Sequence, residues 1–321
     1  MKRGMWLAAV ALLLLSAVSL LSPWAALRDL LQADQKLGWL ILVELRLPRM
    51  LLAIGYGATL GLTGAALQAL FANPLASPDL TGGSSGAALG AVAGGYWLGL
   101  THPLTLAASG AAGALLALAL LLALAGRRSD TATLLLAGLA ISLAAGAATS
   151  LLLALAPSPF AFYDSFDWLM GSLVDRSLPQ AAAALVPASV AGVLISRHVR
   201  SLDLLALGED VAASSGYRPG AMRLEIIALS AVAVGACVSV CGAVGFVGLI
   251  APVIARRLTG GHPGRALWPA ALIGAALLLG ADLLTRLAPD GRSIPLGVIT
   301  AAAGTPLFLW VVLRMRWRLT P

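Results

Sequence analysis

Residues 44–91 read ELRLPRMLLAIGYGATLGLTGAALQALFANPLASPDLTGGSSGAALGA. Two arginines and a proline precede a glycine-rich apolar run, and an Asn-Pro-Leu-Ala turn leads into a second glycine-rich run. Glycines at helical spacing allow helix backbones to touch, and the turn exposes polar backbone groups. A helix that only crosses lipid needs neither feature, so this stretch predicts a closely packed membrane segment with a further role.

Composition places the whole chain in lipid. Of 321 residues, 60% are hydrophobic and only 11% are charged, and the mean hydropathy is +0.93. These values predict an all-α polytopic membrane protein, with residues 1–321 forming a single transmembrane domain. The net charge of +7 is divided among short clusters between apolar runs. Such clusters indicate orientation in a membrane and argue against nucleic-acid binding.

Residues with catalytic or metal-binding chemistry are sparse. Cys237 and Cys241 lie four apart in an apolar run, which favours packing as small apolar side chains over a disulfide. The three histidines stand at the ends of apolar runs and predict no metal site. The sequence contains no nucleophile–base arrangement and no Gly-x4-Gly-Lys-Ser/Thr phosphate loop. We therefore expect no catalytic residue, no bound cofactor and no enzyme activity.

About ten apolar runs approach the roughly 20 residues that a membrane crossing needs. With ten spans and both termini in the cytoplasm, the main basic clusters fall on one face, and one span more or fewer would scatter them. These clusters are Lys2/Arg3, Arg127/Arg128, Arg197/Arg200, Arg256/Arg257/Arg265 and Arg314/Arg316/Arg318. The expected spans are residues 6–26, 48–71, 80–99, 103–125, 132–155, 179–196, 223–241, 244–258, 267–287 and 295–313.

Four arginines break this pattern, because the same topology places Arg46, Arg49, Arg286 and Arg292 outside. Contact with lipid headgroups and contact with a partner protein on the outer face both explain them. The outer loop at residues 160–168 is rich in aromatic side chains. It indicates either an interfacial belt or the mouth of a pathway.

The longest polar interval on the cytoplasmic side, at residues 197–223, reads RHVRSLDLLALGEDVAASSGYRPGAMR. Its apolar spacing predicts one short amphipathic helix that Gly216 ends, followed by a turn at Pro219. Such a helix either lies on lipid or enters a groove of a partner protein. The acidic residues Asp203, Glu209 and Asp210 would be repelled by anionic lipid, which favours the protein partner.

Five motifs occur in order along the chain. They are RLPR at 46–49, GxxxQxxxxNPLAxPDLxGxxxGA at 64–87, LALGE at 205–209, GxxGFVGLIAPxxxR at 242–256 and PLGVITAxxGxPLFLWVV at 295–312. With them the chain resembles the FecCD-type permease subunit of binding-protein-dependent ATP-binding-cassette (ABC) importers for iron–siderophores, haem and cobalamin.

The resemblance implies a ten-helix permease of the bacterial inner membrane that pairs with a second copy of itself. It also implies two ATPase subunits, which would use ATP and Mg, and a periplasmic substrate-binding protein. No residue of the sequence distinguishes a ferric siderophore from haem or cobalamin as the cargo.

The resemblance further assigns roles to residues at matching positions. Docking of the binding protein falls to Arg46, Arg49 and Arg286, and a cytoplasmic gate falls to Asn73, Leu75, Thr131 and Ala132. Coupling to the ATPase falls to a cytoplasmic helix pair at about Leu205–Gly216, within a segment at residues 200–220, through Leu205, Ala206, Leu207, Gly208, Glu209, Ala212 and Gly216.

An ion-coupled secondary transporter or a channel is the alternative from another functional class. Such proteins place ionisable residues within their spans. Here the acidic residues Asp79, Asp130, Glu225 and Asp282 fall near the ends of predicted spans. This placement disfavours ion coupling and favours an energy source on a partner chain.

Overall fold

The computed structural model describes residues 2–22, 24–125, 131–156, 168–287 and 294–319. All regular structure in these ranges is helical, which confirms the all-α class. Seven helical stretches in them are long and apolar enough to cross a membrane. The long helices are α1 (Lys2–Leu21), α4 (Leu47–Leu70), α5 (Gly83–Tyr96), α6 (Pro103–Ala125), α7 (Thr131–Ala154), α9 (Leu178–Ser196), α12 (Pro219–Cys241), α13 (Val247–Leu258), α14 (Leu267–Thr285) and α15 (Leu296–Leu319).

Helix α4 occupies the centre of the bundle and packs against α9, α12, α13 and α14. Glycine makes this packing close: a Cβ at Gly61 would overlap the carbonyl oxygen of Ala270 on α14, and one at Gly64 would overlap that of Gly248 on α13. The backbone contact predicted for the glycines of this stretch is therefore confirmed along α4.

Three segments meet at one place, which we call the glycine junction: the loop at Gly171, the break after α12 at Gly242 and the start of α15 at Gly297. The break between α12 and α13 spans residues 242–246, where the sequence predicted the division of the seventh and eighth spans. The Ser172 amide donates to the Cys241 carbonyl at 2.8 Å, and the Gly297 amide donates to the Met170 carbonyl at 2.9 Å. These bonds satisfy backbone groups that the broken helices leave free.

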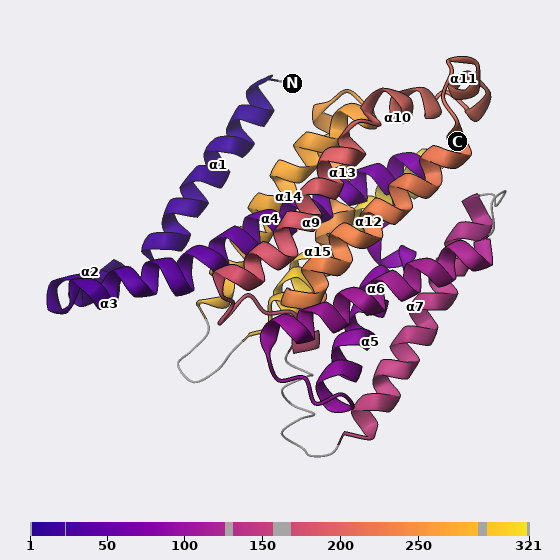
Figure 1. Ribbon diagram of the computed structural model, residues 1–321. Helices are drawn as coiled ribbons and strands as arrows, with labels where there is room; N and C mark the ends of the chain where they lie inside the picture. The colour runs from indigo at the N-terminus through magenta and orange to yellow at the C-terminus, as the bar shows by residue number, and fades with distance from the viewer. Residues whose placement is uncertain (1, 23, 126–130, 157–167, 288–293, 320–321) are drawn as a thin grey trace.

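A helical hairpin between α1 and α4 was not predicted. The expected first span ran to residue 26, but α1 ends at Leu21 and α2 (Trp24–Ala33) and α3 (Gln35–Ile41) follow. Asp34 caps α3 by accepting hydrogen bonds from the Lys36 and Leu37 amides. A five-residue π-helical turn, η1 (Leu42–Arg46), then joins α3 directly to α4. Figure 1 shows the hairpin projecting sideways from the bundle.

The two ends of the bundle carry different features. The short helices α10 (Val199–Leu205) and α11 (Glu209–Ser214) lie at one end, together with the start of α1 (Figure 1). We call this the α10–α11 end. The opposite end holds the start of α4, the end of α14 and the end of α1, and we call it the arginine end after Arg46, Arg49 and Arg286.

Candidate functional site

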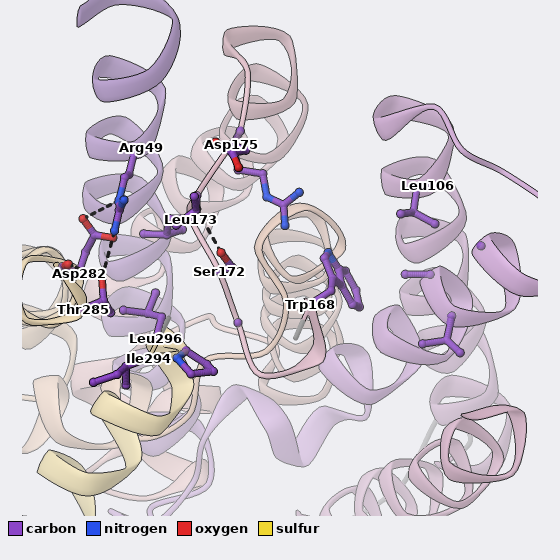
Figure 2. A pocket seen from close by; sticks show the side chains of 17 residues that line it. Arg49, Leu106, Trp168, Ser172, Leu173, Asp175, Asp282, Thr285, Ile294 and Leu296 are labelled. Carbon is purple, nitrogen blue, oxygen red and sulfur yellow. Dashed lines mark hydrogen bonds and ion pairs between the residues drawn. The ribbon is translucent and has the colours of Figure 1, made fainter. Parts of the chain in front are cut away.

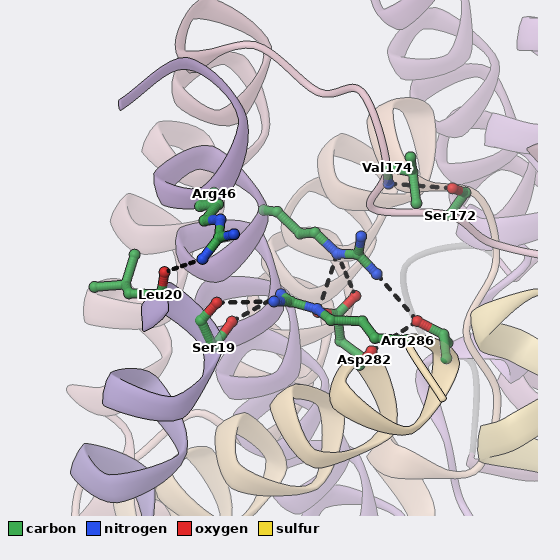
Figure 3. Close-up of polar contacts among 9 residues, drawn as sticks. Ser19, Leu20, Arg46, Ser172, Val174, Asp282 and Arg286 are labelled. Carbon is green, nitrogen blue, oxygen red and sulfur yellow. Dashed lines mark hydrogen bonds and ion pairs between the residues drawn. The ribbon is translucent and has the colours of Figure 1, made fainter. Parts of the chain in front are cut away.

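Two of the three predicted docking arginines, Arg49 and Arg286, come from segments far apart in sequence and bind one acidic side chain, and Arg46 lies near Arg286. Asp282 lies in the last turn of α14, and its side chain is only 2% exposed. The Arg49 Nε donates to both carboxylate oxygens of Asp282, at 2.8 and 3.1 Å. Arg286 donates to the same carboxylate at 2.9 Å (Figure 3). We call Arg46, Arg49, Arg286 and Asp282 the arginine cluster.

Arg49 also donates to the Thr285 hydroxyl at 3.0 Å, whereas Arg46 and Arg286 bind the end of α1. Arg286 donates to the Ser19 carbonyl at 2.8 Å and to its hydroxyl at 2.9 Å. Arg46 donates to the Leu20 carbonyl, also at 2.8 Å. Carbonyls in the last turn of a helix lack partners within that helix, so the two arginines supply them. The cluster thus ties α1, α4 and α14 together.

Asp282 was not predicted as a site residue. The sequence did carry a signal, because Asp282 precedes Arg286 by four residues and this spacing places the two side chains on one helix face. The side chains of Arg49 and Arg286 are 19% and 17% exposed, so each retains a small accessible surface beside its internal bonds.

A cavity of about 580 Å³ opens beside the cluster (Figure 2). Its wall mixes charged and polar side chains with apolar ones; Arg49, Ser172, Asp175, Arg176, Asp282, Thr285, Trp168 and Leu296 are among them. Burial lowers the pKa of the Arg176 guanidinium from its ordinary value, because the charged form loses solvation. Among the described residues, no group of three or more His, Cys, Asp or Glu side chains could hold a metal ion.

The predicted gate residues lie in two segments near the α10–α11 end. Asn73 and Leu75 occupy the turn after α4, where the Asn73 side chain accepts a hydrogen bond from the Leu75 amide at 2.9 Å. Ala132 is exposed in the first turn of α7, and the side chain of Thr131 lies outside the described residues.

The predicted coupling segment is two helices rather than one. Helix α10 stops at Leu205 and α11 starts at Glu209, so the single helix expected from the apolar spacing was wrong and the helix pair implied by the resemblance is present. The cause is Gly208, whose φ of 123° lies in a region that only glycine adopts readily. Gly216, with φ of 89°, ends α11 as predicted.

Attachments to the bundle differ between the two helices. Asp203 of α10 accepts a hydrogen bond from the Gly264 amide at 2.8 Å. Gly264 packs so closely against α10 that a Cβ there would overlap the Val199 carbonyl. Helix α11 is held by the buried side chain of Ala212 and by an ion pair between Glu209 and Arg223 on α12.

The surface around these attachments is open. Ala206, Leu207, Gly208 and Gly216 are exposed, with Leu207 at 70%, whereas Leu205 is half-buried. Exposed apolar side chains of this kind mark a surface that contacts either a protein partner or the membrane. Arg292 and the aromatic loop at residues 160–167 lie outside the described residues.

Comparison with known proteins identifies the family. A model described as the FecCD transport family matches residues 5–314. The chain belongs to this family. The vitamin B12 import system permease protein BtuC of Vibrio cholerae is 39% identical, over 97% of this chain and 92% of its own length. The Fe(3+)-citrate import system permease protein YfmE of Bacillus subtilis is 35% identical, over 95% and 92%.

Solved structures agree with the family assignment. An ABC transporter of the metal-chelate type, in an inward-facing conformation, superposes on this FecCD member with a TM-score of 0.87 and 27% identity, covering 98% of this chain and 100% of its own. PsaBC from Streptococcus pneumoniae, with a TM-score of 0.54 and 20% identity, shares the fold alone. An ion-coupled secondary transporter or channel is not favoured, because these relatives and the first of these structures are ABC importer permeases or transporters.

Proposed function

We propose that this FecCD member is the permease subunit of a binding-protein-dependent ABC importer in the bacterial inner membrane. Its cargo would be an iron complex, such as a ferric siderophore or haem, or else cobalamin. The family match over residues 5–314 carries the proposal. Relatives named for vitamin B12 and Fe(3+)-citrate support the cargo class.

In the proposed assembly, two copies of the chain cross the bilayer through ten spans each, with both termini in the cytoplasm. The arginine end faces the periplasm and receives a substrate-binding protein. Two ATPase subunits, which use ATP and Mg, bind at the α10–α11 end. The chain itself binds no cofactor and no nucleic acid.

The described contacts support binding of a different partner at each end of the chain. At the arginine end, rim cations would steer and orient an acidic partner more than they add affinity. At the other end, the exposed Leu207 offers an apolar contact to an ATPase groove. Because α10 is fixed to the turn before α14 through Asp203 and Gly264, force applied there would pass directly into the bundle.

The decisive experiment is reconstitution in vesicles with the cognate ATPase and binding protein. We expect uptake of cobalamin or a ferric chelate that requires ATP, the binding protein and this permease together. Uptake driven by a proton gradient without the ATPase would refute the proposal. So would purification of a tagged permease, from cells that co-express the ATPase, without any ATPase attached.

A further inference from the structure

The buried carboxylate of Asp282 has no role in the docking scheme described so far. It accepts hydrogen bonds from two of the three docking arginines, one on α4 and one on its own helix. Both of its oxygens are engaged, since Arg49 contacts each of them. An anion so placed fixes long side chains that would otherwise sample many rotamers.

Charge balance gives the same residue a second effect. The cluster contains three guanidinium charges and one carboxylate, which leaves a net charge of +2. Arg46 and Arg286 bind adjacent carbonyls of α1, so like charges are held near each other. A carboxylate between cations reduces their mutual repulsion and keeps them in one arrangement.

We propose that Asp282 is the positioning residue of the docking site: it presents Arg49 and Arg286 to an acidic partner in one fixed arrangement and moderates their charge. The inference rests on the proposed docking role of these arginines. Because the arginines are already ordered before binding, their side chains lose less conformational entropy when the partner binds. The partner would then compete for cations whose orientation Asp282 has already set.

The first test measures positioning without any partner. The complete importer in lipid nanodiscs is treated with phenylglyoxal, and modification of each arginine is followed by peptide mass spectrometry. Modification of the exposed Arg28 serves as the internal standard. On this scale we expect modification of Arg49 and Arg286 to be about fivefold higher in Asp282→Asn than in the wild type, because both arginines lose an ionic partner. Unchanged modification overturns the inference, whatever the binding protein does.

The second test measures rate constants with the importer's own labelled binding protein. Asp282→Asn raises the cluster charge to +3, so we expect association to become about twofold faster at low salt. Dissociation should become about tenfold faster, because ordering the arginines in the complex now costs free energy and makes the complex less stable. A change that merely loosened the fold would lower the binding-competent fraction without accelerating association. Wild-type rate constants in Asp282→Asn overturn the inference.

Asp282→Glu provides a variant that keeps the charge, should Asp282→Asn not fold. We expect unchanged association and faster dissociation, because the longer side chain displaces the arginines; unchanged dissociation counts against positioning by Asp282. The docking proposal fails separately, if reversing Arg46, Arg49 and Arg286 together leaves binding unaltered.

Discussion

Arg46 is the docking arginine with the fewest described ties to its own chain, since its one described hydrogen bond goes to the Leu20 carbonyl. Arg46→Glu should therefore test docking with little damage to the fold. We expect the affinity for the binding protein to fall about tenfold at roughly 10 mM salt and about twofold at roughly 0.5 M, because salt screens exposed charges.

The matched control for Arg46→Glu is Arg28→Glu on the hairpin, at an exposed arginine paired with its neighbour Asp29. This variant makes the same charge change away from the cluster and should bind as the wild type does. Equal weakening in both variants would show a non-specific charge effect and remove Arg46 from the docking surface.

The packing of α4 gives a second residue-scale prediction. Gly64→Ala places a Cβ against the Gly248 carbonyl, where backbone rather than a flexible side chain must move. We expect a loss of about 1–3 kcal/mol in stability, measured by thermal unfolding in detergent. Gly280→Ala on α14 is the control, because a Cβ there meets nothing within 4 Å. Similar losses in both variants would contradict a close α4–α13 contact.

At the scale of single residues, the sequence singled out the cations of the arginine cluster but not the acidic side chain that two of them bind. Arg46, Arg49 and Arg286 stood out because they broke the charge pattern of the membrane topology. Asp282 did not stand out, because a carboxylate near a predicted span end is common. Its burial between two arginines depends on α4 and α14 touching, and contacts between distant segments leave no mark in local composition.

At the scale of elements, the coupling segment depends on one backbone conformation. Gly208→Ala should strain the link between α10 and α11, at a cost of about 1–3 kcal/mol, because φ of 123° is unfavourable for residues with a Cβ. We expect α11 to shift, so that ATP-driven uptake falls while the ATPase still hydrolyses ATP. The ratio of uptake to hydrolysis in vesicles is the measurement.

Gly220→Ala is the control for this change, because Gly220 also faces open space but does not have a positive φ. It should leave the ratio of uptake to hydrolysis unchanged. A normal ratio in Gly208→Ala would show that the geometry of the α10–α11 link does not transmit force.

Long apolar helices were predictable because about 20 apolar residues in a row have few other solutions in lipid. The predicted run at 103–125 has the same bounds as α6. The hairpin at α2 and α3 was missed because it is amphipathic and short, and its start was absorbed into the apolar run before it. The apolar spacing alone did not predict the break at Gly208, because the spacing continues across it; only the family resemblance implied two helices there.

At the scale of the whole molecule, α7 presents a surface that one chain does not cover. Leu143 is 66% exposed there. A Cβ at Gly146, three residues further along α7, would meet nothing within 4 Å, whereas a Cβ at Gly61 or Gly64 on α4 would overlap a neighbouring helix. We expect a second copy to lie against this helix. Leu143→Cys should then give a cross-linked dimer with a short bismaleimide, detected as a doubled mass on a denaturing gel.

The native cysteines do not interfere with this experiment, because Cys237 and Cys241 are both fully buried. Leu13→Cys on α1 is the control: Leu13 is 71% exposed, close to the value for Leu143, but α1 lies at the far side of the bundle from α7 (Figure 1). Dimers with Leu13→Cys and none with Leu143→Cys would place the partner copy elsewhere.

Helix α4 connects the two ends of the molecule as one uninterrupted rod from Leu47 to Leu70. Its 24 residues extend about 36 Å, so a tilt of about 5° at one end would move the other by about 3 Å. Arg49 stands at one end of this lever and Asn73 just past the other. The fluorescence of a probe attached at Asn73 should therefore change when a partner binds at the arginine end of the bundle, even with no cargo present.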